Sequence, residues 1–175
     1  TIIFILLFII IGLSVPKNSG SVSLDTSDFL RIHIRANSNL ETDQNIKYTI
    51  KDEFVNFLTP LICECESKDD AIRIVNENKK SLENIADKIL NDNGYQYKSN
   101  IDIRREQFPT RTYDGYTLES GVYDSIIVEL GSASGNNWWC VIYPPLCFTN
   151  YNSNYQNVVY KSKIMEIINK FFEKG

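Results

Sequence analysis

The stretch NNWWCVIYPPLCF, residues 136–148, contains both tryptophans and two of the four cysteines of this 175-residue chain. Its segment Trp138–Tyr143 contains only apolar, aromatic and β-branched residues, which is typical of a buried β-strand. Alternation along a strand predicts two apolar faces, one with Trp138, Cys140 and Ile142 and the other with Trp139, Val141 and Tyr143. We therefore expect a central strand that is covered on both sides and ends at Pro144 and Pro145, because proline cannot donate to a sheet ladder.

The cysteines next to this strand allow two interpretations. Cys140 and Cys147 either form a disulfide, which would stabilise the fold by about 2–3 kcal/mol, or remain two buried thiols. An extracytoplasmic location would permit the disulfide. Cys63 and Cys65 are one residue apart and are poorly placed to bridge each other. The four cysteines lack the paired spacing of a zinc site, and we expect neither a metal nor a cofactor.

Composition limits the class of protein. Hydrophobic residues make up 43% of the chain and charged residues 23%, as in an ordinary globular domain. The formal net charge of −4 argues against a nucleic-acid partner, since such proteins carry a basic excess. The length suggests one domain with appendages.

The chain divides into four expected segments. Residues 1–13 are almost entirely apolar, and we expect a signal or membrane anchor that is truncated at its start, with a buried core helix as the alternative. Residues 14–28 are expected to form a linker, residues 29–150 the folded domain and residues 151–175 an amphipathic helical extension. The folded part should then lie outside the cytoplasm.

The first half of the domain predicts a strand and two helices. Residues 29–36 alternate, with Leu30, Ile32 and Ile34 on one face and Arg31, a partly exposed His33 and Arg35 on the other. A capping box of Ser38 and Glu41 should start a helix that runs to about Leu58, where Pro60 ends or kinks it. Ser67 should start a second helix, and Asn93-Gly94 should end it.

The second half predicts mainly strands. We expect strands at residues 95–106 and 121–130, with a loop at residues 107–115 between them. The turn at residues 131–135 should join the strand at 121–130 to the Trp138 strand as an antiparallel hairpin. This order predicts an α+β fold in which a small, mostly antiparallel sheet packs against two to three helices.

Two kinds of functional site are possible. Phe108, Arg111 and Tyr113 in the loop are residue types that dominate protein interfaces, unless the loop packs Phe108 onto the core. The other possibility is a cysteine hydrolase in which His33, the one histidine, activates Cys140 or Cys147. A cysteine buried in an apolar strand is usually inert, and no phosphate-binding loop or nucleophile elbow is present.

Several segments together resemble the stage II sporulation protein R family. The matching segments are Leu30–Ser38, Asp43-Gln44 with Lys47 and Asp52, Phe108–Tyr113, Gly121–Tyr123, Asn137–Val141 and Pro144–Phe148. The resemblance covers about residues 29–150. The chain departs from the family pattern at Glu119-Ser120, where Pro-Ala is usual, and at Ile142-Tyr143, where Met-Phe or similar is usual.

The resemblance implies a function that composition alone does not. Members of the family are exported from the forespore and activate a membrane-embedded aspartic-type peptidase of the mother cell, which processes pro-sigma-E. The implied role is a non-catalytic activator. We expect receptor contacts from the loop and from the strand edge (Phe108, Arg111, Tyr113, Trp138, Trp139), and a structural role for Cys140, Cys147, Pro144 and Pro145. The alternatives are a cysteine-dependent envelope peptidase or amidase, and a purely structural anchoring module.

Overall fold

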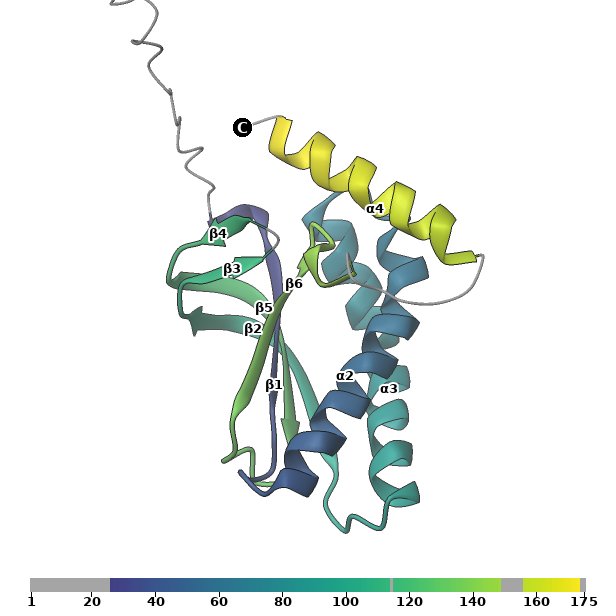
Figure 1. Ribbon diagram of the computed structural model, residues 1–175, viewed down its shortest axis with the longest axis vertical. Coiled ribbons are helices and arrows are strands. Elements are labelled where there is room, and N and C mark those ends of the chain that lie inside the picture. The colour runs from purple at the N-terminus through teal and green to yellow at the C-terminus, as the bar shows by residue number, and fades with distance from the viewer. Residues whose placement is uncertain (1–25, 114, 149–155, 174–175) are drawn as a thin grey trace, which may run out of the picture.

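A four-stranded sheet with two long helices on one face forms the body of the protein. The computed structural model describes residues 26–113, 115–148 and 156–173. The sheet order is β2-β5-β1-β6, formed by β2 (Ser99–Phe108), β5 (Gly121–Leu130), β1 (Leu30–Arg35) and β6 (Asn137–Tyr143). Helices α2 (Glu41–Ile62) and α3 (Lys68–Asp92) lie side by side against one face (Figure 1). The expected α+β class is confirmed.

The sheet is mixed. Strand β1 runs parallel to β5 and antiparallel to β6, and β2 runs antiparallel to β5. The expected hairpin between β5 and β6 is wrong, because β1 lies between them. Strand β6 is therefore an edge strand of the described sheet and not a central one.

The turn after β5 explains this topology. It passes around the end of β1, where the Gly135 N–H donates to the Ala36 carbonyl at 2.9 Å and the Ser132 N–H donates to Asn37 Oδ1 at 2.9 Å. A Cβ atom at Gly135 would lie 2.1 Å from the carbonyl oxygen of Ser38, so only glycine fits this crossing. The chain then returns as β6 on the far side of β1.

The start of α2 differs from the expected capping box. The N-cap is Leu40, which makes no side-chain cap hydrogen bond. Ser38 instead accepts from the Leu40 N–H and donates to Asp43 Oδ2 at 2.6 Å, which ties the end of β1 to the first turn of α2. The helix also continues through Pro60 to Ile62, past its expected end.

The start and end signals of α3 are confirmed. Ser67 accepts from the Asp70 N–H at 3.1 Å, and the helix ends at Asp92 with Asn93 as its C-cap, followed by Gly94, whose φ of +81° is left-handed. The following strand starts at Ser99, later than expected, and extends to Phe108. The main core lies between the helices and the sheet and includes Ile32, Ile34, Ile50, Phe54, Leu58, Val75, Leu82, Ile126 and Val128.

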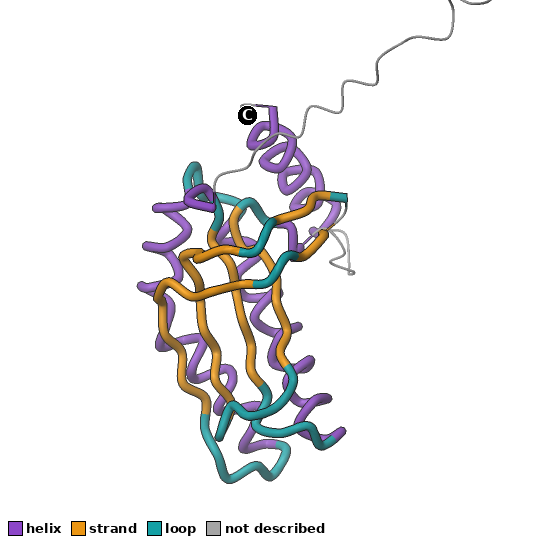
Figure 2. The backbone as a smooth tube through the Cα atoms, turned by 90° about the vertical axis from the view of Figure 1, so that its left-hand side faces the viewer, coloured by secondary structure: helices purple, strands orange, loops and turns teal. Residues whose placement is uncertain are grey.

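The remaining elements lie at one end of the sheet. The expected loop contains a small hairpin, β3 (Arg111–Tyr113) and β4 (Tyr116–Leu118), on the side of the sheet away from α2 and α3 (Figures 1 and 2). Two short 3-10 helices, η1 (Thr26–Asp28) and η2 (Leu146–Phe148), precede β1 and follow β6. Helix α4 (Gln156–Glu173) packs across this end, where Phe172 stacks on Tyr116 at a centroid distance of 4.0 Å.

The expectations for the N-terminus fall largely outside the described residues. Residues 1–25 hold the expected signal or anchor and most of the expected linker. Within the described ranges, no helix combines the length and apolar character needed to cross a membrane.

Candidate functional site

Three basic side chains lie on the sheet face that α2 and α3 leave uncovered. As alternation predicts, β1 directs Arg31, His33 and Arg35 toward this open face, where they contact residues of β2, β3, β5 and β6. His33 is only 2% exposed and Arg31 is fully buried. The expectation of a partly exposed His33 is wrong, because Trp139 and Phe108 cover its ring.

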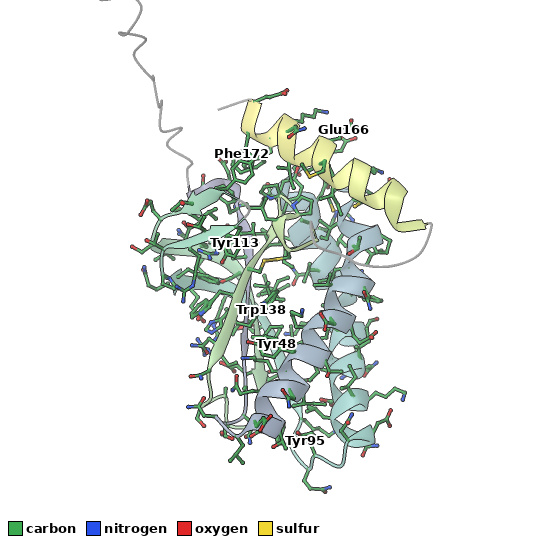
Figure 3. All side chains as sticks on the ribbon, in the orientation of Figure 1. Tyr48, Tyr95, Tyr113, Trp138, Glu166 and Phe172 are labelled. Atoms are coloured by element: carbon green, nitrogen blue, oxygen red, sulfur yellow. A yellow bond between two sulfur atoms is a disulfide. The ribbon has the colours of Figure 1, made fainter. Side chains whose placement is uncertain are left out.

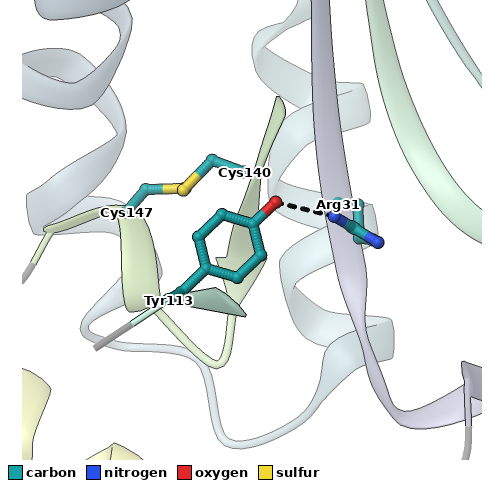
Figure 4. Close-up of a disulfide and its surroundings, with 4 residues drawn as sticks. All are labelled: Arg31, Tyr113, Cys140 and Cys147. Atoms are coloured by element: carbon teal, nitrogen blue, oxygen red, sulfur yellow. Dashed lines mark hydrogen bonds between the residues drawn. A yellow bond between two sulfur atoms is a disulfide. The ribbon is translucent and has the colours of Figure 1, made fainter. Parts of the chain in front are cut away.

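Arg31 lies in a cage of aromatic rings. Its guanidinium carbon is 4.3 Å from the ring centroid of Phe108, 4.7 Å from that of Tyr123 and 5.7 Å from that of Tyr113. Nη2 donates to the Tyr113 hydroxyl at 2.7 Å (Figure 4). Each cation–π contact contributes about 0.5–2 kcal/mol. Burial lowers the pKa of Arg31, although the contact with Tyr113 favours the charged form.

His33 occupies the middle of the open face. Its ring stacks on Trp139 with centroids 3.6 Å apart, and Nδ1 lies 2.8 Å from Glu106 Oε1. An ionised carboxylate can only accept, so Nδ1 carries the hydrogen. Burial lowers the pKa of His33, whereas the side chains of Asn137 and Glu106 favour the protonated form and act in the opposite direction. The neutral ring is therefore the form favoured at neutral pH.

Arg35 belongs to a network of ion pairs at the other end of the face. It donates to Glu129 Oε1 at 2.8 Å and to Glu106 Oε1 at 2.5 Å. Arg104 donates to the same two glutamates at 3.2 and 3.4 Å. Burial alone would raise the pKa of Glu129, but hydrogen bonds from Asn100 and Arg104 hold it below its usual value.

The residues expected to bind a receptor are only partly brought together. Tyr113 and Trp139 lie on the open face and are half-buried, and Arg111 is exposed on the hairpin. Phe108 is fully buried between Arg31, His33 and Trp139, so in this conformation it packs and offers no surface. Trp138 lies on the side of β6 that faces α2 (Figure 3), with Lys51 Nζ 5.9 Å from its ring centroid.

The structure joins Cys140 and Cys147 in a disulfide with a Cα–Cα distance of 5.8 Å, which ties β6 to η2 (Figure 4). Pro144 and Pro145 between them are buried. Cys63 and Cys65 are free and buried, and burial raises the pKa of each thiol to about 11. They are therefore protonated at neutral pH and poor nucleophiles.

The cysteine–histidine pair of a hydrolase is not assembled in this structure. Cys140 pairs with Ile32 and shares the helix-covered face, whereas His33 lies on the open face, and the sulfur of Cys140 is held in the disulfide. The described residues also contain no cluster of His, Cys, Asp and Glu that could hold a metal ion.

Sequence reasoning missed the partners of the basic side chains. Glu106 contacts His33, Arg35 and Arg104, and Glu129 contacts both arginines. One signal was available: the alternation of Arg31, His33 and Arg35 places three basic groups on one face of a strand, and such a face needs acidic or aromatic neighbours.

Comparison with known proteins identifies the family of the chain that carries this surface. Residues 26–153 match the family described as stage II sporulation protein R (spore_II_R). The chain belongs to this family. The match includes the whole open face, from η1 through η2, and ends before α4.

A curated relative supports the assignment to the stage II sporulation protein R family. Stage II sporulation protein R of Bacillus subtilis (strain 168) is 31% identical over 124 residues, which cover 71% of this chain and 55% of the relative. The chain thus spans about half the length of this relative. No solved structure matches.

Proposed function

We propose that this member of the stage II sporulation protein R family is a signalling protein between forespore and mother cell. It is exported from the forespore and activates the membrane-embedded aspartic-type peptidase that processes pro-sigma-E. The observation that carries this proposal is the family match over residues 26–153. The protein acts as a ligand of the peptidase and performs no catalytic step itself.

The open face and the hairpin supply the proposed contact surface. Arg111, Tyr113 and Trp139 are of the types that contribute most binding energy in protein interfaces. Arg111 is exposed, and the other two are half-buried above a rigid layer of rings. A ligand shifts its receptor toward an active state only through its higher affinity for that state. This surface must therefore fit the active peptidase better than the inactive one.

Two features support an extracytoplasmic location. The Cys140–Cys147 disulfide persists in oxidising compartments and is rare in the cytosol. The apolar segment at residues 1–13 has the composition of a signal or anchor. Both fit export into the space between the two cells, with membrane attachment through the N-terminal segment.

A reconstitution in vegetative cells tests the proposal. The cells carry the cognate peptidase and pro-sigma-E, and they export the full chain. We expect the sigma factor to shorten only when both export and the peptidase are present. No shortening, with the exported protein shown to be folded, would contradict the proposed function.

A single surface variant then tests the contact surface. Arg111→Ala should reduce the rate of shortening about tenfold or more, because an interface arginine of this kind contributes about 2 kcal/mol. Its thermal unfolding should stay within 1–2 °C of wild type, roughly the change expected for an exposed side chain. Lys80→Ala, which removes an exposed cation on α3, is the matched control. Full signalling by Arg111→Ala would remove the hairpin from the surface.

A further inference from the structure

Three buried polar atoms on the open face have no hydrogen-bond partner. Arg31 Nε, Arg31 Nη1 and His33 Nε2 are the only such side-chain atoms among the described residues. Both side chains contact Phe108, with Arg31 Cζ 4.3 Å and the His33 ring 6.0 Å from its ring centroid. Nearly all buried polar groups in folded proteins are paired, so three exceptions beside one ring require an explanation.

The chemistry of Arg31 identifies the missing group. A buried charge without a counter-ion is costly, and no carboxylate pairs with Arg31 in the part of the chain that the structure describes. Its polar neighbours are the hydroxyl of Tyr113, which accepts from Nη2, and the hydroxyl of Tyr123, and neither oxygen carries a countercharge. Hydrogen bonds from guanidinium to carboxylate are about twice as strong as neutral ones.

We propose that Arg31 and His33 form a closed binding site for one carboxylate, supplied by a small free acid or by an acidic side chain of a partner. The carboxylate oxygens would replace the Tyr113 hydroxyl at Nη2 and accept from the unpaired N–H groups of Arg31. A single carboxylate balances the charge of the guanidinium. The site takes no metal and needs no covalent step.

Tyr113 controls access to this site. Phe108 and Tyr123 are buried, whereas Tyr113 is half-buried and is the outermost ring of the cage. It belongs to a two-stranded hairpin with three residues in each strand, which pairs with no strand of the main sheet. Two-stranded hairpins are marginally stable alone. In this proposal the hairpin moves to open the cage, and no strand pairing of the main sheet has to break, although the contact of Tyr116 with Phe172 must adjust.

His33 couples the site to pH. In the neutral ring, Glu106 holds the hydrogen at Nδ1, so Nε2 is an acceptor and repels a carboxylate. The protonated ring donates from Nε2, and carboxylate binding is therefore accompanied by proton uptake and is tighter at low pH. The groups that act on this ring are Arg35 on β1, Glu106 on β2, and Asn137 and Trp139 on β6. The neighbouring guanidinium of Arg31 is faced by Tyr113 on β3 and Tyr123 on β5.

The test measures thermal unfolding of the purified full chain, so its result is independent of whether the protein signals. Sodium acetate replaces sodium chloride at constant ionic strength, and a blocked Gly-Glu-Gly peptide is compared with its Gln analogue. We expect Tyr113→Ala, which opens the cage, to gain about 3–5 °C at a tenfold excess of carboxylate over its Kd. The gain should be larger at pH 5.5 than at pH 7.5.

Matched variants locate the effect. Adding Arg31→Met to Tyr113→Ala should abolish the gain, and this variant should fold because an apolar side chain replaces a buried charge. If the double variant with Arg31→Met does not fold, Arg31→Gln replaces it in the same test. Tyr116→Ala changes the same hairpin at a ring that contacts Phe172 of α4, and it should show no gain beyond that of wild type.

Each outcome decides the proposal. A wild-type gain with acetate identifies a small free acid as the ligand, and a gain with the glutamate peptide alone identifies a side chain. A gain confined to Tyr113→Ala supports the site with Tyr113 as its cover. No gain in wild type or Tyr113→Ala, or an equal gain in the Arg31 variants, would overturn it.

Discussion

Arg31 and Arg35 lie on the same face of the same strand, four residues apart, and their surroundings are opposite. Arg31 is fully buried among three aromatic rings and has no carboxylate partner among the described residues. Arg35 keeps 26% of its side chain exposed and bonds two glutamates. Residue type and strand position thus do not decide how a cation is stabilised. The neighbours that cover it decide.

The cover differs along the open face. The β3–β4 hairpin covers Arg31 and excludes water from it. Contacts with aromatic rings therefore offset most of the cost of burying its charge. No comparable hairpin covers Arg35 among the described residues. Its charge is therefore stabilised by water together with the two glutamate carboxylates. The aromatic end should therefore be sensitive to loss of a ring, and the ionic end to loss of a carboxylate.

The largest effect is expected at Tyr113. Tyr113→Ala removes a half-buried ring and leaves Nη2 of Arg31 without its acceptor, which should destabilise the fold by about 3–4 kcal/mol. Tyr113→Phe keeps the ring and should cost about 1–2 kcal/mol. Urea unfolding measures both. Equal costs would mean that the hydroxyl dominates and that the ring contributes little to the cage.

A smaller loss is expected at Glu106. Glu106→Gln weakens its contacts with His33, Arg35 and Arg104 at once and should destabilise by about 2 kcal/mol, since the carboxylate is largely buried. Glu77→Gln, in an exposed pair with Arg73 on α3, is the control and should cost about 0.5 kcal/mol or less. If the two variants unfold at the same urea concentration, the ionic end of the face contributes no more than an ordinary surface pair.

The smallest effect is the pH dependence from His33. Its pKa in the folded state is lowered, mainly by burial, so the unfolded chain binds the proton more readily. Stability from this group is fully present above the unfolded pKa of about 6.5 and is lost as pH falls below it, by at most about 1.4 kcal/mol per pH unit. Unfolding at pH 7.5 and 5.5 measures the slope. His33→Gln should flatten it, and an unchanged slope in that variant would assign it to other groups.

The local features were predictable because they depend on nearest neighbours in the chain. Alternation identified the two faces of β1, and Ser67 and Gly94 marked the ends of α3. The pairing of β6 was not predictable in this way. A short turn favours a hairpin, but the turn at residues 131–135 bonds to Ala36 and Asn37, which lie far away in the sequence.

The sequence by itself determined the main strands and the long helices, the spacing of the two cysteines beside Pro144 and Pro145, and the order Arg31, His33, Arg35 on one strand face. Only the tertiary structure decided that β1 separates β5 from β6 and that a small hairpin covers Arg31 but not Arg35. The physical reason is the distance along the sequence over which each interaction acts. Alternation and capping act over a few residues, whereas burial and ion pairing depend on groups that folding brings together from more than seventy residues away.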